Sequence, residues 1–185
     1  MRIKKALRED QDLIDRFLAV LGSGLTIASV SRVAKPGFFL YATEFIHGYL
    51  EPVYLKKEDA LLETLEYCGF PSDQGPVGNM RNGHRKSRDL SRMLTEAARL
   101  WQSGDEAGRS DAIWATSEYT SLMRRNFELL KNLIYPLLEQ STTPEDEQKL
   151  AARINLLSFQ EAETDGSEKY LKMIEALEEE VSDWR

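Results

Sequence analysis

The spacing of the apolar residues constrains this chain more than any other feature of its sequence. Between clusters of glycine and proline, apolar side chains recur at positions i, i+3, i+4 and i+7, which is the period of one face of an α-helix. The alternation of apolar and polar residues that marks a half-buried strand is nowhere sustained. The sequence therefore predicts an all-α protein.

Breaker residues divide the chain into predicted helices at about residues 7–21, 36–68, 77–101, 111–140, 145–164 and 167–184. The first weakens at Gly22-Ser23-Gly24, and residues 25–33 are either helical or irregular. The first four are long and joined by short connections, which favours an antiparallel four-helix up-and-down bundle. We expect this bundle in residues 1–140, and two additional helices in residues 141–185 that pack on the same domain.

The net charge and the counts of particular residue types exclude several classes of protein. A net charge of −7 argues against a nucleic-acid partner held through phosphate contacts. The single cysteine, Cys68, excludes an internal disulfide framework and a cysteine-based zinc cluster. No run of about 18 apolar residues predicts a membrane span, so we expect no membrane partner and a cytoplasmic location. The chain has two histidines, so a metal site within it can have at most two histidine ligands.

Several segments, in order, resemble the hemerythrin-like (HHE cation-binding) family. They are Leu7-Arg8-Glu9-Asp10-Gln11-Asp12-Leu13-Ile14, Tyr54-Leu55-Lys56-Lys57-Glu58-Asp59, Gly75-Pro76-Val77-Gly78-Asn79-Met80 with His84 and Arg88 beyond it, Tyr119 to Asn126 with Tyr135-Pro136-Leu137, and a tail with Glu161 and Tyr170 to Leu177. The resemblance covers residues 7–177 and implies the same helical bundle. In that family a non-haem di-iron pair sits inside the bundle, bound by histidines and bridging carboxylates.

Most positions that the resemblance assigns to iron ligands carry other residues here. Gln11, Tyr54 and Asn126 stand where the family has histidines, Met80 lies one turn before the third-helix histidine, and Leu130 or Lys131 takes an acidic position. Glu58 and His84 remain. Two ligands cannot hold two irons, because iron needs several oxygen and nitrogen donors converging on one point. One interpretation is a refilled core, in which Gln11, Tyr54, Asn126, His84 and Glu58 form a buried hydrogen-bonded network.

A second interpretation is a metal site rebuilt on the second helix. Glu44, His47, Glu51, Tyr54 and Glu58 recur at steps of three and four residues, so they share one face. The Glu44-x-x-His47 spacing is also the one that ferritin-like bundles use for di-iron ligands. Iron or another divalent metal would then be held by His47, Glu51, Tyr54 and Glu58, with His84 opposite. The alternative is that Glu44 and Glu51 are solvated and that the histidine is structural.

Three functions follow from these interpretations. The first is a hemerythrin-like protein with an altered metal site and a sensing, binding or regulatory role, and the others are an iron-dependent oxidase and a metal-free protein-interaction module. The second helix has a further apolar face, with Phe45, Ile46, Tyr49 and Val53, which either the C-terminal helices or a second subunit covers. A homodimer and a protein or small-molecule ligand are therefore the partners to test.

Overall fold

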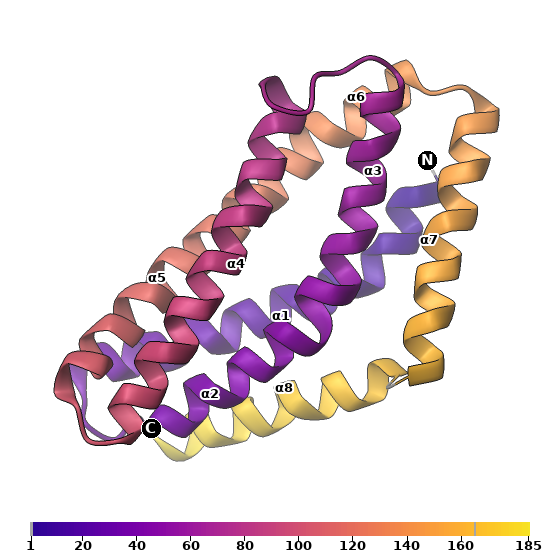
Figure 1. The fold of residues 1–185 in the computed structure, drawn as a ribbon. Helices are drawn as coiled ribbons and strands as arrows, with labels where there is room; N and C mark the ends of the chain where they lie inside the picture. The colour runs from indigo at the N-terminus through magenta and orange to yellow at the C-terminus, as the bar shows by residue number, and fades with distance from the viewer. Residues whose placement is uncertain (1, 165) are drawn as a thin grey trace.

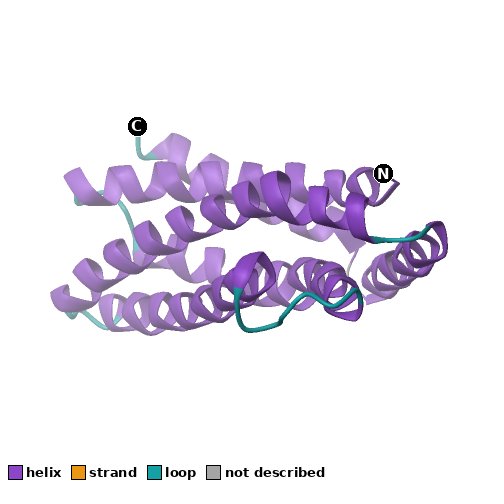
Figure 2. Cartoon of the chain, turned by 90° about the horizontal axis from the view of Figure 1, so that it is seen from above, coloured by secondary structure: helices purple, strands orange, loops and turns teal. Residues whose placement is uncertain are grey.

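The structure is a computed structural model that describes residues 2–164 and 166–185, and every regular element within them is helical (Figure 2). The elements are α1 (Arg2–Val30), α2 (Pro36–Phe45), the π-helical segment η1 (Ile46–Tyr54), α3 (Leu55–Tyr67), α4 (Gly75–Gln102), α5 (Glu106–Leu129), the π-helical segment η2 (Leu130–Ile134), α6 (Tyr135–Ser141), α7 (Pro144–Thr164) and α8 (Gly166–Asp183). The predicted all-α class is confirmed.

Contiguous elements form longer helices. The second predicted helix is α2, η1 and α3 in succession, from Pro36 to Tyr67, and the fourth is α5, η2 and α6, from Glu106 to Ser141. α1 continues through Gly22 to Val30, so the predicted weakening does not interrupt it. The proline at the first turn of α7 has a pre-set φ and lacks an amide that would have no partner there, which explains why the helix starts at Pro144.

The helices pack lengthwise rather than as separate units. α4 and α5 run side by side in opposite directions, and α2 lies against α4 (Figure 1). α1 contacts α5 on one side and the C-terminal helices on the other. α7 runs beside α3, and α8 runs beneath α1 and α2 (Figure 1). The C-terminal helices therefore pack directly on the N-terminal ones.

α1 is by length and composition apolar enough to cross a membrane, from Ile3 to Val30, although a core helix passes the same test. Ile14, Phe17 and Leu21 of this helix are fully buried, whereas Val30 is 83% exposed and 39% of the apolar window as a whole is buried. The expected absence of a membrane partner and the cytoplasmic location stay predictions.

The core consists of two apolar clusters. One gathers the second half of α1 with α2, η1, the end of α4, the start of α5 and α8. The other gathers the start of α1 with α3, the start of α4, η2, α6 and α7. Along each long helix, buried or half-buried polar residues lie between the stretches that feed the two clusters, for example Gln11 on α1 and His84 on α4. A polar layer thus crosses the molecule between the clusters.

The second apolar face of the second helix is covered from within the chain. The ring of Tyr170 on α8 lies 4.8 Å from the ring of Tyr49 and 6.0 Å from that of Phe45, between centroids. The Tyr170 hydroxyl also donates a hydrogen bond of 2.9 Å to the Gly48 carbonyl. In an α-helix that carbonyl would accept from residue 52, which is a proline without an amide. The wider π-helical turn and Tyr170 together carry the helix past Pro52.

Candidate functional site

The polar layer brings together residues from α1, α3, α4 and α5. Its buried or nearly buried members are Asp10, Lys57, Glu58, His84, Ser87, Ser91 and Asn126. Buried charges need partners, because an unpaired ion loses its hydration without compensation. The ion pairs and hydrogen bonds of the layer fall into separate groups.

His84 lies between two carboxylates. Its Nε2 is 2.8 Å from Glu58 Oε2 and its Nδ1 is 2.8 Å from Asp59 Oδ1, and the side chains of His84 and Glu58 are almost fully buried. A carboxylate only accepts hydrogen bonds when ionised, so a histidine with a carboxylate at each nitrogen donates from both. Consecutive residues of α3 thus hold opposite sides of one ring from α4.

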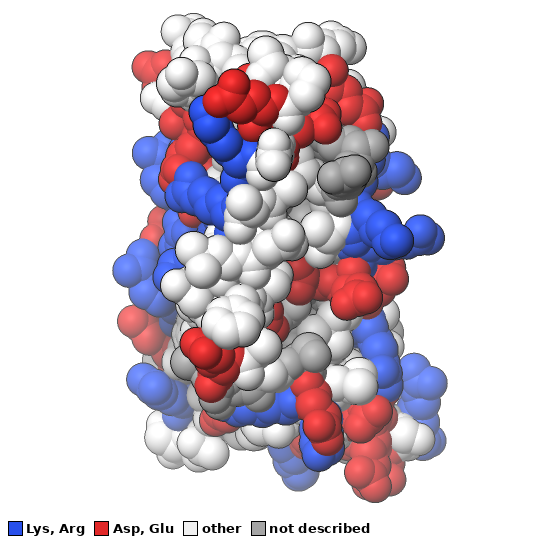
Figure 3. Space-filling model, turned by 90° about the vertical axis from the view of Figure 1, so that its right-hand side faces the viewer, with Lys and Arg blue, Asp and Glu red and all other residues white. Residues whose placement is uncertain are grey.

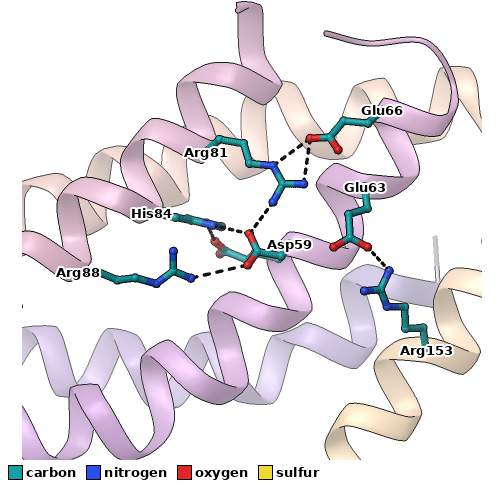
Figure 4. A network of polar contacts seen from close by, with 8 residues as sticks. Asp59, Glu63, Glu66, Arg81, His84, Arg88 and Arg153 are labelled. Carbon is teal, nitrogen blue, oxygen red and sulfur yellow. Dashed lines mark hydrogen bonds and ion pairs between the residues drawn. The ribbon is translucent and has the colours of Figure 1, made fainter. Parts of the chain in front are cut away.

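Further cations surround Asp59. Arg81, one turn before His84 on α4, donates to Asp59 at 3.2 Å and to Glu66 at 2.9 Å, and Arg88 lies 3.7 Å from Asp59 (Figure 4). Beside this network, Arg153 of α7 pairs with Glu63 of α3 (Figure 4). The contacts tie three helices together, and they extend from the buried layer to the surface.

The network sets the protonation of His84. Burial alone lowers the pKa of His84, but the hydrogen bonds to Asp59 and Glu58 and the charges of both carboxylates outweigh it and raise the pKa to about 9. Burial raises the pKa of Asp59, but the hydrogen bond from His84 and the nearby cations outweigh that and lower it. At neutral pH His84 is therefore an imidazolium.

Gln11 forms the second group. Its amide nitrogen donates to the hydroxyl of Tyr135 at 2.9 Å and to that of Tyr54 at 3.3 Å. Burial, followed by the neighbouring Glu58 carboxylate, raises the pKa of Tyr54 well above its usual range, so its hydroxyl stays protonated. Of the network predicted from Gln11, Tyr54, Asn126, His84 and Glu58, Gln11 is hydrogen-bonded to Tyr54 and His84 to Glu58, in two separate parts.

Two atoms of this layer have no hydrogen-bond partner in the part of the chain that the structure describes, Glu58 Oε1 and Asn126 Nδ2. The expectation that each member satisfies its neighbours is wrong for these two. Asn126 lies against Gly83 of α4, where an added Cβ would collide with its amide. The glycine therefore lets the asparagine approach the backbone next to His84.

The other residues of the rebuilt-site hypothesis gather elsewhere. His47 Nε2 lies 3.2 Å from Ser91 Oγ, and the Ser91 hydroxyl donates to Glu51 at 2.5 Å. Glu44 and His47 are exposed, whereas Glu58 is engaged with His84. The structure therefore brings Glu58 and His84 together, and separately His47 and Glu51, which meet at Ser91. Ser91 was not among the predicted site residues, and only its helical register opposite Glu51 could have indicated its role.

A third group went unrecognised in the sequence. Lys57, of which 1% of the side chain is exposed, donates to Asp10 at 2.9 Å and to Glu161 at 3.4 Å. The Tyr49 hydroxyl donates to the other Asp10 oxygen at 2.6 Å. The signal was Lys57 in the apolar face of the second helix, four residues beyond Val53 and eight beyond Tyr49.

These residues do not fit the di-iron centre that the family resemblance implies. A histidine that donates from both nitrogens has no lone pair for a metal. Gln11 and Asn126 offer amides, and Met80 and Leu130 are buried in the second apolar cluster rather than presented as ligands. Among residues 2–164 and 166–185, no three His, Cys, Asp or Glu side chains are grouped so as to hold a metal ion.

Comparison with known proteins adds no relative. No family model matches the sequence, and neither a curated protein nor a solved structure is significantly similar to it.

Proposed function

We propose that this chain is a hemerythrin-like four-helix bundle with two C-terminal helices, in which an ion-pair network replaces the metal centre and which acts by binding rather than by catalysis. The observation that carries the proposal is the position of His84, held at both ring nitrogens by Glu58 and Asp59. An imidazolium fixed in this way is the counter-ion of the buried Glu58 carboxylate, so that carboxylate needs no metal ion to balance its charge.

The burial of the surrounding positions supports the same view. Met80 and Leu130 are buried in the second apolar cluster, where they add apolar volume to a close-packed interior. The pairing of α4 with α5 and of α2 with α4 is compatible with the bundle, and the C-terminal helices follow the order expected from the resemblance. A binding, sensing or regulatory role needs no redox centre.

The iron-dependent oxidase receives less support. Its site requires His47, Glu51, Tyr54 and Glu58 to converge with His84 on one ion. His47 instead faces Ser91 at an exposed position, and the Tyr54 hydroxyl, which is the weaker ligand when protonated, accepts from Gln11. We therefore rank this function below the binding role.

The test is metal analysis of freshly purified protein together with its absorption spectrum. We expect no stoichiometric iron, no oxo-bridge bands in the near ultraviolet and no tyrosinate band in the visible. Nitrogen NMR of His84 should report protons on both ring nitrogens at pH 7, and its signals should not change with a chelator. Two irons per chain, or a His84 signal that shifts on adding ferrous iron, would overturn the proposal.

A further inference from the structure

The helix α7 has apolar residues on two opposite faces. Its inner face packs on α3 and α1, and Leu150 and Ile154 are buried there. On its outer face, Leu156 and Phe159 lie one helical turn apart, and 56% and 61% of their area is exposed. Single exposed apolar residues are normal, whereas a contiguous apolar patch indicates an interaction surface. The outer face of α7 is therefore a candidate interaction surface.

The residues along this outer face follow a seven-residue spacing. Lys149, Leu156 and Glu163 are seven residues apart, and Ala152 and Phe159 lie between them. Seven residues make almost two turns of an α-helix, so these side chains share one stripe, the α7 stripe, and all five are exposed. Figure 3 shows uncharged surface along the face that α7 covers, with charged side chains on both sides. The α7 stripe is apolar at its centre, basic at one end and acidic at the other.

The α7 stripe is complementary to a reversed copy of itself. When two such helices pack antiparallel about a two-fold axis at Leu156, Lys149 of one copy faces Glu163 of the other. Ala152 then faces Phe159, so a small side chain leaves room for a large ring. A parallel arrangement would instead bring Lys149 against Lys149 and Glu163 against Glu163, which like-charge repulsion disfavours. Charge and side-chain size therefore both select the antiparallel pairing.

The charged ends of the α7 stripe are not needed to hold the fold together. Lys149 pairs with Glu145 of its own helix, and the two side chains are 71% and 76% exposed. An exposed pair of this kind contributes little to stability, so exchanging it for Glu163 of a second copy costs little. Glu163 is itself exposed, on the last turn of α7. Both charges can therefore pair across an interface without disturbing the packing of α7 on α3.

We propose that the outer face of α7 binds the same face of a second copy of this chain, antiparallel, in a symmetric homodimer. From Lys149 to Glu163 the α7 stripe is about 21 Å long, at 1.5 Å per residue. A single helix face of this length buries less than a standard interface, about 800 Å² per partner, so the dimer is a weak one that forms as the concentration rises. The contact involves no residue of the His84 network, so the inference goes beyond the proposed function and is tested independently of it.

Sedimentation velocity of the full chain over a wide range of concentrations measures the association. We expect a monomer at low concentration and a dimer at high concentration. Leu156→Glu places two carboxylates against each other at the symmetry axis and should weaken association by about tenfold or more.

The matched control is Met93→Glu, which puts the same charge at an apolar residue that is 45% exposed on α4, away from α7 (Figure 1). This variant should associate like the unmodified protein. Circular dichroism checks that both variants are folded.

A charge exchange tests the pairing of the two ends. Glu163→Lys should weaken association, because two lysines then face each other at both ends of the contact, and the double variant Lys149→Glu/Glu163→Lys should restore it. A dimer through any other surface would not show this recovery. A chain that is monomeric at every concentration would leave the outer face of α7 to a different protein and overturn the inference. Equal effects of Leu156→Glu and Met93→Glu, or no recovery in the double variant, would overturn it too.

Discussion

His84 has a carboxylate at each of its two ring nitrogens. A histidine that binds iron offers a lone pair to the metal and usually donates its other N–H to a carboxylate or carbonyl. Here Glu58 accepts at Nε2 and Asp59 accepts at Nδ1, so neither nitrogen has a lone pair for a metal. Glu58 and His84 are thus sufficient for an ion pair and insufficient for a di-iron centre.

Removing the charge of His84 should leave Glu58 buried without a counter-ion. We expect His84→Gln to lower the free energy of unfolding by about 3–5 kcal/mol, the usual effect of breaking a buried pair. The double variant Glu58→Gln/His84→Gln should recover part of that loss, because no unpaired charge remains. Urea denaturation at pH 7 measures both. A single variant as stable as the unmodified protein would contradict the ion pair.

The same pair predicts how stability depends on pH. The folded pKa of His84, about 9, lies above its ordinary value of 6.5, so its contribution is complete below about pH 6.5 and is lost as the pH rises through 9. Asp59 acts oppositely, because its lowered pKa stabilises the fold above its ordinary value of 3.8 and this is lost in acid. Denaturation between pH 6 and 10 should show a decline that His84→Gln reduces.

The sequence predicted part of this site. Glu58 and His84 were identified through the family resemblance, but Asp59 and Arg81 were not, although Asp59 lies in one of the segments that carry it and Arg81 directly follows another. Helical spacing shows which residues share a face and not which neighbour a side chain reaches across the interface. The partners of Lys57 were hidden for the same reason, since Asp10, Lys57 and Glu161 lie on three different helices.

At the scale of the element, two glycines in α1 show that the residue type alone does not tell whether packing requires a glycine at a position. Gly22 and Gly24 predicted a weakened helix, yet α1 is continuous there. A Cβ at Gly24 would collide with the buried ring of Phe38, whereas a Cβ at Gly22 would meet only the Arg124 side chain, at 4.0 Å. One glycine is required by packing between α1 and α2, and the other is not.

These two glycines form a matched pair of substitutions. Gly22→Ala should raise the free energy of unfolding by up to about 1 kcal/mol, the difference in helix propensity. Gly24→Ala gains the same propensity but overpacks the core, so a net loss of about 1–3 kcal/mol is expected. Thermal and urea unfolding measure both variants. Equal effects of the two substitutions would show that α1 does not pack on Phe38 in this way.

The π-helical segments were beyond sequence prediction, and two helices are longer than predicted: α1 runs from Arg2 to Val30 rather than over 7–21, and α5 starts at Glu106 rather than at 111. A proline within a helix predicts that the α-helical hydrogen bonding is interrupted there. In the structure this stretch is π-helical, and Tyr170 supplies the donor that Pro52 lacks.

Tyr170→Phe should therefore lower the free energy of unfolding by about 1 kcal/mol, because its hydrogen bond to the Gly48 carbonyl is lost. Urea denaturation measures it, and Tyr67→Phe, at an exposed tyrosine, is the control.

At the scale of the whole molecule, the two apolar clusters and the polar layer between them make the C-terminal helices integral to the fold. α8 contributes Ile174 and Leu177 to the first cluster, and α7 contributes Leu150 and Ile154 to the second. The sequence placed residues 141–185 on the same domain from order alone. Their role in completing the charge balance at Lys57 required the structure.

This arrangement predicts that the N-terminal helices do not form a stable unit alone. A chain ending at Ser141 would expose Phe45 and Tyr49, which Tyr170 covers, and would leave Lys57 without Glu161. The exposure of apolar surface and the loss of a buried ion-pair partner both destabilise the folded state. We therefore expect a loosely packed state that binds a hydrophobic dye and unfolds without a cooperative transition. Circular dichroism and dye fluorescence measure this. The full chain, as control, should unfold in a single transition, and a cooperative fold of residues 1–141 would show instead that the four N-terminal helices are an independent bundle.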